Sequence, residues 1–112
     1  MAVGKPFVDG PAYVAASATD MYTSPDSTNI AQVRHIHLAN TSASAINVKL
    51  YVGATGASTG GTEIYDADIP ADSVDDIYFP AGLPITSSLF IVGIAGTIST
   101  VAATITGDLI VA

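Results

Sequence analysis

Apolar and polar residues alternate most regularly between residues 46 and 53. The apolar positions are Ile46, Val48, Leu50 and Val52, and the positions between them hold Asn47, Lys49 and Tyr51. A period of two is what a half-buried antiparallel strand requires, because successive side chains point to opposite faces. Residues 30–40 predict a second strand, and the small polar residues Asn40 to Ser44 favour a turn between the two. Residues Gln32 to Gly53 are therefore predicted to form a β-hairpin.

Short strands are predicted along the rest of the chain, because Val, Ile and Thr dominate and turn residues recur at short intervals. The expected strands cover residues 13–16, 20–24, 30–40, 45–54, 62–69, 74–79, 87–95 and 99–111. The apolar run from Leu89 to Ile94 is typical of a central strand buried on both faces. Gly107 interrupts the inner face of the last strand and indicates a bulge or a close backbone contact. The fold class is therefore all-β, a single antiparallel β-sandwich or jelly roll of about eight strands.

Residues 1–12 are predicted to form an extended N-terminal arm, followed by the sandwich domain over residues 13–112. Pro6 and Pro11 each restrict the preceding residue to extended conformations. Such an arm would be loose in a free monomer and could lie on a neighbour in an assembly. Lys5, Pro6 and Phe7 are accordingly candidate interface residues.

The composition points to a surface that is covered by partners. Hydrophobic residues make up 49% of the chain and charged residues only 12%, about half of the ~25% typical of soluble domains. A freely diffusing monomer normally relies on mixed surface charge for solubility. The chain also has only two lysines with which to protect exposed sheet edges. We therefore expect another subunit to occupy those edges.

The charge balance excludes several classes of partner. The net charge is −7, and the cations are Lys5, Arg34 and Lys49. Three scattered cations cannot neutralise a phosphate backbone or an anionic membrane surface, so neither nucleic acid nor membrane is an expected partner. The absence of cysteine excludes disulfides and thiol chemistry. The N-terminus has no continuous apolar core of a secretory signal, which predicts synthesis in the cytoplasm.

His35 and His37 lie two residues apart on a predicted strand, so their side chains share a face. This spacing can place two imidazoles on one metal ion. A third ligand would have to be an Asp, because the chain has no cysteine and no other histidine. A polar strand face, or a histidine pair at a subunit contact, explains the same residues.

Five carboxylates fall within a stretch of eleven residues: Asp66, Asp68, Asp72, Asp75 and Asp76. Oxygen-rich surfaces suit hard cations such as Ca²⁺, but the DxDxDG pattern of a calcium loop is absent. Two neighbouring strands with outward polar faces would give the same sequence. We therefore expect no metal and no cofactor, and the candidate ligands, were one bound, are His35, His37, Asp66 and Asp68.

The chain is not expected to be an enzyme. No Gly-x-Ser-x-Gly elbow is present, and nothing ties a particular serine to either histidine. The glycine-rich residues 53–61 lack the Lys-Ser/Thr of a phosphate-binding loop and predict a mobile hairpin loop. The five tyrosines serve either as interface anchors or along the edge of the core.

Several short motifs follow one another along residues 20–112. They are Tyr22-Thr23 with Pro25, then Val33-Arg34 leading through Ile36 and Leu38 to Asn40-Thr41, then Ile69-Pro70-Ala71, and a last strand that carries Gly107. In this order they resemble the small β-sandwich virion proteins of tailed bacteriophages.

That resemblance implies a non-enzymatic capsid decoration (cement) protein. Such a protein would sit on the capsid surface of the virion, bind the major capsid protein across subunit boundaries, and form a homo-oligomer, with a trimer favoured. Arg34, His35 and His37 would join the arm as groups available to a neighbour. Two alternatives stay open: a tail, neck or fibre component, and a carbohydrate- or Ca²⁺-binding β-sandwich module.

Overall fold

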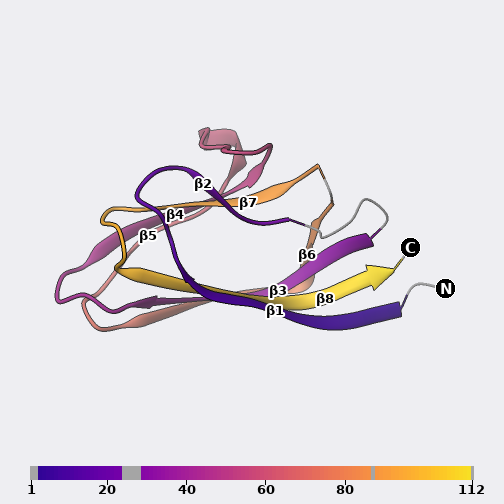
Figure 1. The fold of residues 1–112 in the computed structure, drawn as a ribbon, viewed down its shortest axis with the longest axis horizontal. Coiled ribbons are helices and arrows are strands. Elements are labelled where there is room, and N and C mark those ends of the chain that lie inside the picture. Colours follow the sequence, from indigo (N-terminus) through magenta and orange to yellow (C-terminus); the bar gives the residue numbers. More distant parts are fainter. Residues whose placement is uncertain (1–2, 24–28, 87, 112) are drawn as a thin grey trace.

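Eight strands stack in two layers (Figure 1). The computed structural model describes residues 3–23, 29–86 and 88–111; the predicted loop from Pro25 and the expected strand start at Ser87 lie outside this range. The strands are β1 (Val3–Tyr13), β2 (Thr19–Tyr22), β3 (Asn29–Asn40), β4 (Ile46–Gly53), β5 (Glu63–Ile69), β6 (Val74–Ile85), β7 (Phe90–Ala95) and β8 (Val101–Val111), with a 3-10 helix η1 (Gly60–Thr62) before β5. No helix in the described residues is both long enough and apolar enough to span a membrane.

The strand order is that of a jelly roll. Sheet A runs β1-β8-β3-β6 and sheet B runs β2-β7-β4-β5, and all pairs are antiparallel. The pairs β1–β8, β2–β7, β3–β6 and β4–β5 are those of one long hairpin wound upon itself, which is the double-sheet jelly-roll pattern. The prediction of an antiparallel sandwich or jelly roll is confirmed, and the pairing selects the jelly roll.

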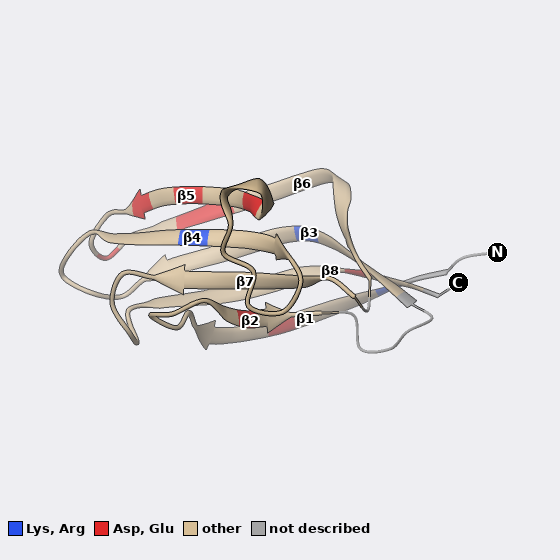
Figure 2. Cartoon of the chain, turned by 90° about the horizontal axis from the view of Figure 1, so that it is seen from above, with Lys and Arg blue, Asp and Glu red and all other residues tan. Residues whose placement is uncertain are grey.

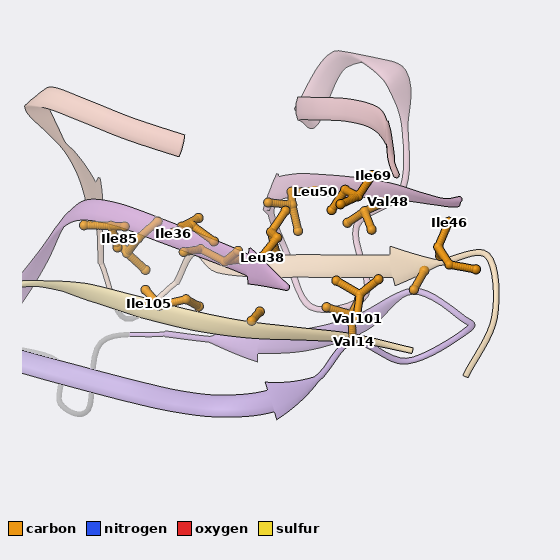
Figure 3. Close-up of a cluster of buried hydrophobic side chains, with 14 of the residues drawn as sticks. Val14, Ile36, Leu38, Ile46, Val48, Leu50, Ile69, Ile85, Val101 and Ile105 are labelled. Atoms are coloured by element: carbon orange, nitrogen blue, oxygen red, sulfur yellow. The ribbon is translucent and has the colours of Figure 1, made fainter. Parts of the chain in front are cut away.

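The core lies between the two sheets (Figure 3). Ile36, Leu38 and Ile105 of sheet A point toward Val48 and Leu50 of sheet B, and all five are buried. Fully burying a side chain of this size stabilises a fold by roughly 1.5–3 kcal/mol. The central position of β7, between β2 and β4, agrees with its predicted burial on both faces. The alternation of β4 is likewise confirmed, with its even-numbered apolar residues facing inward.

The predicted hairpin from Gln32 to Gly53 is wrong. Both strands exist, but β3 belongs to sheet A and β4 to sheet B, so the polar turn between them crosses from one layer to the other. Asn40 explains the crossing. Its buried amide nitrogen donates to the carbonyl oxygens of Ser44 (2.8 Å), Ile69 (2.9 Å) and Pro70 (3.2 Å), and its amide oxygen accepts from Ser42. The end of β3 is thereby tied to the end of β5 in the opposite sheet.

The predicted N-terminal arm is also corrected. Residues 3–13 are extended, as their prolines require, but they form β1 and pair with β8 from Val3 to Tyr13. The short strand predicted at residues 13–16 is absent from the described chain, where β1 ends at Tyr13. Proline and glycine argue against a central strand, which favoured an unpaired arm. An edge strand tolerates both residues, and β1 lies at the edge of sheet A.

A bulge in β3 reverses which residues face the core. Ala31 and Val33 are buried before it, and Ile36 and Leu38 after it, so the inward positions change from odd to even numbers. The shift lies between Val33 and His35, opposite Gly107 of β8. The predicted close backbone contact at Gly107 is therefore confirmed. β6 also continues past Pro80, where a break was predicted, because its register shifts at the same bulge.

Prolines protect both edges of sheet A. Pro6 and Pro11 lie in β1, and Pro80 and Pro84 lie in β6. A proline offers no N–H to an incoming strand, and bulges distort the edge further; both edge strands have register shifts. The low lysine count suggested that another subunit covers these edges. Prolines and bulges protect them within the chain itself, so a covering subunit is not needed to explain them.

Candidate functional site

The two sheets differ in how their outer faces are covered. On sheet B, Tyr51 and Val92 point outward yet are buried, at 5% and 0% exposure. The loop of residues 54–62 crosses above β4 and β7 to reach β2 (Figure 2), where the Gly56 N–H donates to Asp20 Oδ1 (2.8 Å) and the Thr55 hydroxyl donates to Asp20 Oδ2. The glycine-rich stretch is thus an anchored cover over sheet B.

Sheet A has no such cover in the described residues, and we call its outer surface the open face. Its outward side chains include Val8, Tyr13, Arg34, His35, His37, Ala39, Val74, Asp76, Tyr78, Ala102, Thr104, Thr106 and Asp108. Of the five large apolar side chains that the described chain exposes, four lie here: Val8, Tyr13, Val74 and Tyr78. Small and apolar groups therefore dominate this surface, with charge confined to a few places.

The His–Asp cluster, formed by His35, His37 and Asp76, lies on the open face. His37 is directly opposite Asp76 in the β3–β6 register. His35 Nε2 and His37 Nδ1 lie 2.7 Å and 2.6 Å from the same carboxylate oxygen, Asp76 Oδ1. The hydrogen bond from His37, followed by that from His35, holds the pKa of the Asp76 carboxyl below its ordinary value. The cluster therefore keeps a negative charge beside two imidazoles.

Tyr78 fixes the position of one imidazole. It is opposite His35 in the register, and the two rings stack with centroids 4.6 Å apart and planes 12° apart. Arg34, the extra residue of the bulge, turns away from the His–Asp cluster toward β8 and β6. Its Nε lies 3.5 Å from Asp108 Oδ2, and its Nη1 donates to the Pro80 carbonyl oxygen (3.2 Å).

The five-carboxylate stretch is divided among different surfaces. Figure 2 marks acidic positions in red along β5 and along the neighbouring part of β6. Asp66 and Asp68 lie on sheet B, where each accepts from the Asn47 amide at 3.0 Å. Asp75 accepts from the Tyr65 hydroxyl, and Asp76 belongs to the open face. The third group beside the histidines is thus Asp76, which was not among the candidate ligands; the alternation of β6 could have indicated it once its pairing with β3 was known.

The candidate interface residues of β1 have separate environments. Lys5 and Pro6 are exposed. Phe7 instead packs against the core, and its ring stacks on Tyr22 with centroids 5.1 Å apart and planes 1° apart. The Phe7 ring is therefore partly buried within the fold, and its contact with a neighbour stays a prediction. Contacts of Lys5, Pro6, Arg34, His35 and His37 with a neighbour stay a prediction.

A shallow hollow opens between β1 and β2. It is lined by Phe7, Val8, Asp9, Asp20, Met21, Tyr22, Thr23 and Phe90. Aromatic rings beside carboxylates are a common sugar-binding combination, but here Phe7 and Tyr22 cover each other's faces and Asp20 is held by the loop of sheet B. One face of each of these two rings is therefore already occupied by the other ring.

Alkaline pH is expected to reveal the Tyr65–Asp75 hydrogen bond. Burial first, and then the bond to Asp75, raise the pKa of Tyr65 above its ordinary value of 10.0. Because the unfolded chain then ionises before the folded one, the stabilisation is complete below about pH 10 and is lost as the pH rises further. We expect Tyr65→Phe to lose less stability than wild type between about pH 9 and pH 11, measured as melting temperature. Tyr78→Phe, which removes an exposed hydroxyl, is the control; an equal loss in Tyr65→Phe and wild type would contradict the assignment.

Comparison with known proteins finds a likeness in structure but none in sequence. No family model matches the chain, and no curated protein matches it. A solved structure described as "Structure of infectious bursal disease virus Gx strain" matches with a TM-score of 0.43 and 14% sequence identity, over 98% of this chain and 31% of that chain. The chain thus spans less than a third of that protein's length. Its own fold and surface define a small jelly-roll domain with one open sheet face.

Proposed function

We propose that the protein is a non-enzymatic structural component of a virion. The observation that carries this proposal is the open face, where four exposed apolar side chains lie among Ala and Thr residues. Sheet B covers its own outer face with a loop, so the exposure on sheet A is not a general property of the fold. The low charge of the chain and the resemblance of its motifs to phage virion proteins support the same role.

The finer proposal is a capsid decoration protein that binds the major capsid protein through the open face. Because prolines blunt the edges of sheet A, docking would use side chains on the face rather than an added strand. Burial of apolar area contributes about 25 cal/mol per Å². Many copies on one shell would make the total large even if each contact were weak. A homotrimer is the favoured oligomer, and a tail or neck component is the alternative that uses the same face.

Immunogold labelling of virus particles from cultures that express the chain tests the proposal. We expect label distributed over the capsid surface. Label confined to the tail or neck would overturn the decoration role in favour of the alternative. Particles that carry no label would overturn the virion role itself.

Substitutions then test the open face. Tyr78→Glu and Val74→Glu are each expected to weaken binding to particles depleted of the protein by about tenfold or more, since a charge in a desolvated contact costs at least ~1.4 kcal/mol. Ile98→Glu is the matched control, because Ile98 is 68% exposed, as Tyr78 is, but lies in the loop between β7 and β8. Cosedimentation measures the binding. Equal losses for Tyr78→Glu and Ile98→Glu would contradict docking through the open face.

A further inference from the structure

We propose that His35, His37 and Asp76 form a three-ligand site for a divalent transition metal, with Zn²⁺ as the best-fitting ion. This site is independent of the virion role. One atom from each residue, two imidazole nitrogens and one carboxylate oxygen, lies within 4.8 Å of the other two. Imidazole and carboxylate are ordinary Zn²⁺ ligands, and three protein ligands with one open position are a recurrent zinc arrangement.

The geometry needs only a small adjustment to accept the ion. Tetrahedral ligands about 2.0–2.1 Å from Zn²⁺ are separated from one another by about 3.3 Å. The two nitrogen–oxygen separations are now 2.7 Å and 2.6 Å. Each must therefore open by well under ~1 Å, which rotation of exposed side chains can supply. To bind the metal, each histidine must present the lone pair of the nitrogen that faces Asp76, which a neutral imidazole does in the tautomer that carries its proton on the other ring nitrogen.

The backbone and one neighbour already hold the ligands near their places. His35 and His37 are two residues apart on β3, and Asp76 is directly opposite His37 on β6, so all three project from hydrogen-bonded neighbouring strands. The stacked Tyr78 ring restricts the orientation of His35. Preorganised ligands lose less conformational entropy when the metal binds.

Charge and access also favour a cation here. The histidines bring no fixed charge when neutral, and Asp76 is an anion whose lone pairs the ion can share. The one arginine of the sequence, Arg34, is directed to Asp108. The three side chains are 26%, 38% and 34% exposed, so an ion reaches them from solvent. Because the three ligands lie on the open face, water or a group of a docked molecule could complete the coordination.

The carboxylates on sheet B provide an internal comparison. Asp66 and Asp68 share the Asn47 amide. Among the described residues, neither belongs to a group of three potential metal ligands that includes a histidine. Two oxygens and an amide make a weaker site for a borderline-soft ion such as Zn²⁺ than two imidazoles and a carboxylate. If Zn²⁺ binding is lost after substitution of a ligand on sheet A but kept after substitution on sheet B, the site is identified.

Calorimetric titration of the full chain with ZnCl₂ tests the proposal. We expect one Zn²⁺ per chain, together with a melting temperature that rises with Zn²⁺ concentration. His37→Ala and Asp76→Asn are each expected to weaken binding by about tenfold or more, because loss of a ligand should cost no less than loss of an outer-shell partner. Asp66→Asn is the matched control and should bind as wild type does.

A second readout keeps the test valid if a variant folds poorly. In wild-type protein, NMR signals of the His35 and His37 rings are expected to shift together in proportion to bound Zn²⁺. Co²⁺ should give the stronger visible absorption of a low-coordinate site when it replaces Zn²⁺. Ring signals that stay unmoved at saturating Zn²⁺, or binding that is lost in Asp66→Asn but kept in His37→Ala, would overturn the proposal.

Discussion

Replacing Gly107 with alanine is expected to destabilise the protein by about 3 kcal/mol or more, at the upper end of the range for an extra methyl group forced into a packed interior. A Cβ at this position would come within 3.0 Å of the Gln32 carbonyl oxygen and of the Val33 Cα. Both are backbone atoms of the adjacent strand, so no side chain can turn aside to make room. β3 would have to move away from β8 at the bulge, where the inward face changes parity.

The clash outweighs the entropic benefit of the substitution. Alanine restricts the unfolded chain and thereby stabilises a compatible site by only about 0.4–1 kcal/mol. Urea denaturation followed by circular dichroism measures the difference. Gly61→Ala is the matched control, because a Cβ there meets nothing within 4 Å. A Gly107→Ala protein as stable as Gly61→Ala would contradict the close packing of β3 on β8.

Replacing Asn40 with alanine is expected to cost about 2–4 kcal/mol of unfolding free energy. Asn40 is 2% exposed, and its amide satisfies three carbonyl oxygens and the Ser42 N–H. Alanine leaves the buried Ile69 carbonyl oxygen without this donor and opens a small void. Because the amide joins sheet A to the end of β5, we also expect hydrogen exchange to quicken in the turn between β3 and β4.

Asn40→Asp separates hydrogen bonding from volume. Aspartate has almost the same shape, but its ionised carboxylate has no donor and would face three carbonyl oxygens. It should therefore be at least as destabilising at pH 7 as alanine. Asn47→Ala is the control, because within the described part of the chain its amide bonds the exposed carboxylates of Asp66 and Asp68. If Asn40→Asp were as stable as wild type, packing rather than hydrogen bonding would fix the crossing.

The strands themselves were largely predictable, because side-chain alternation is a local property. Residues 30–40, 62–69 and 99–111 match β3, β5 and β8 closely, and the close backbone contact at Gly107 was predicted from a single glycine on an inner face. Strand pairing was harder to foresee. Neighbours in sequence need not be neighbours in a sheet, and the predicted hairpin of β3 and β4 failed because Asn40 satisfies its amide in the opposite layer.

The candidate site likewise has one part that the sequence determined and one part that the tertiary structure decided. His35 and His37 share a face because they lie two residues apart on one strand, and the sequence alone determined this. The sequence alone also determined the all-β class and the low charge. Tertiary structure decided that Asp76, rather than Asp66 or Asp68, stands beside them, since that depends on how β6 pairs with β3. It likewise decided that one sheet face is covered and the other open, because the cover is a loop reaching Asp20 from thirty-five residues away. Period and composition act within a strand, whereas contacts between strands depend on the packing of the whole chain.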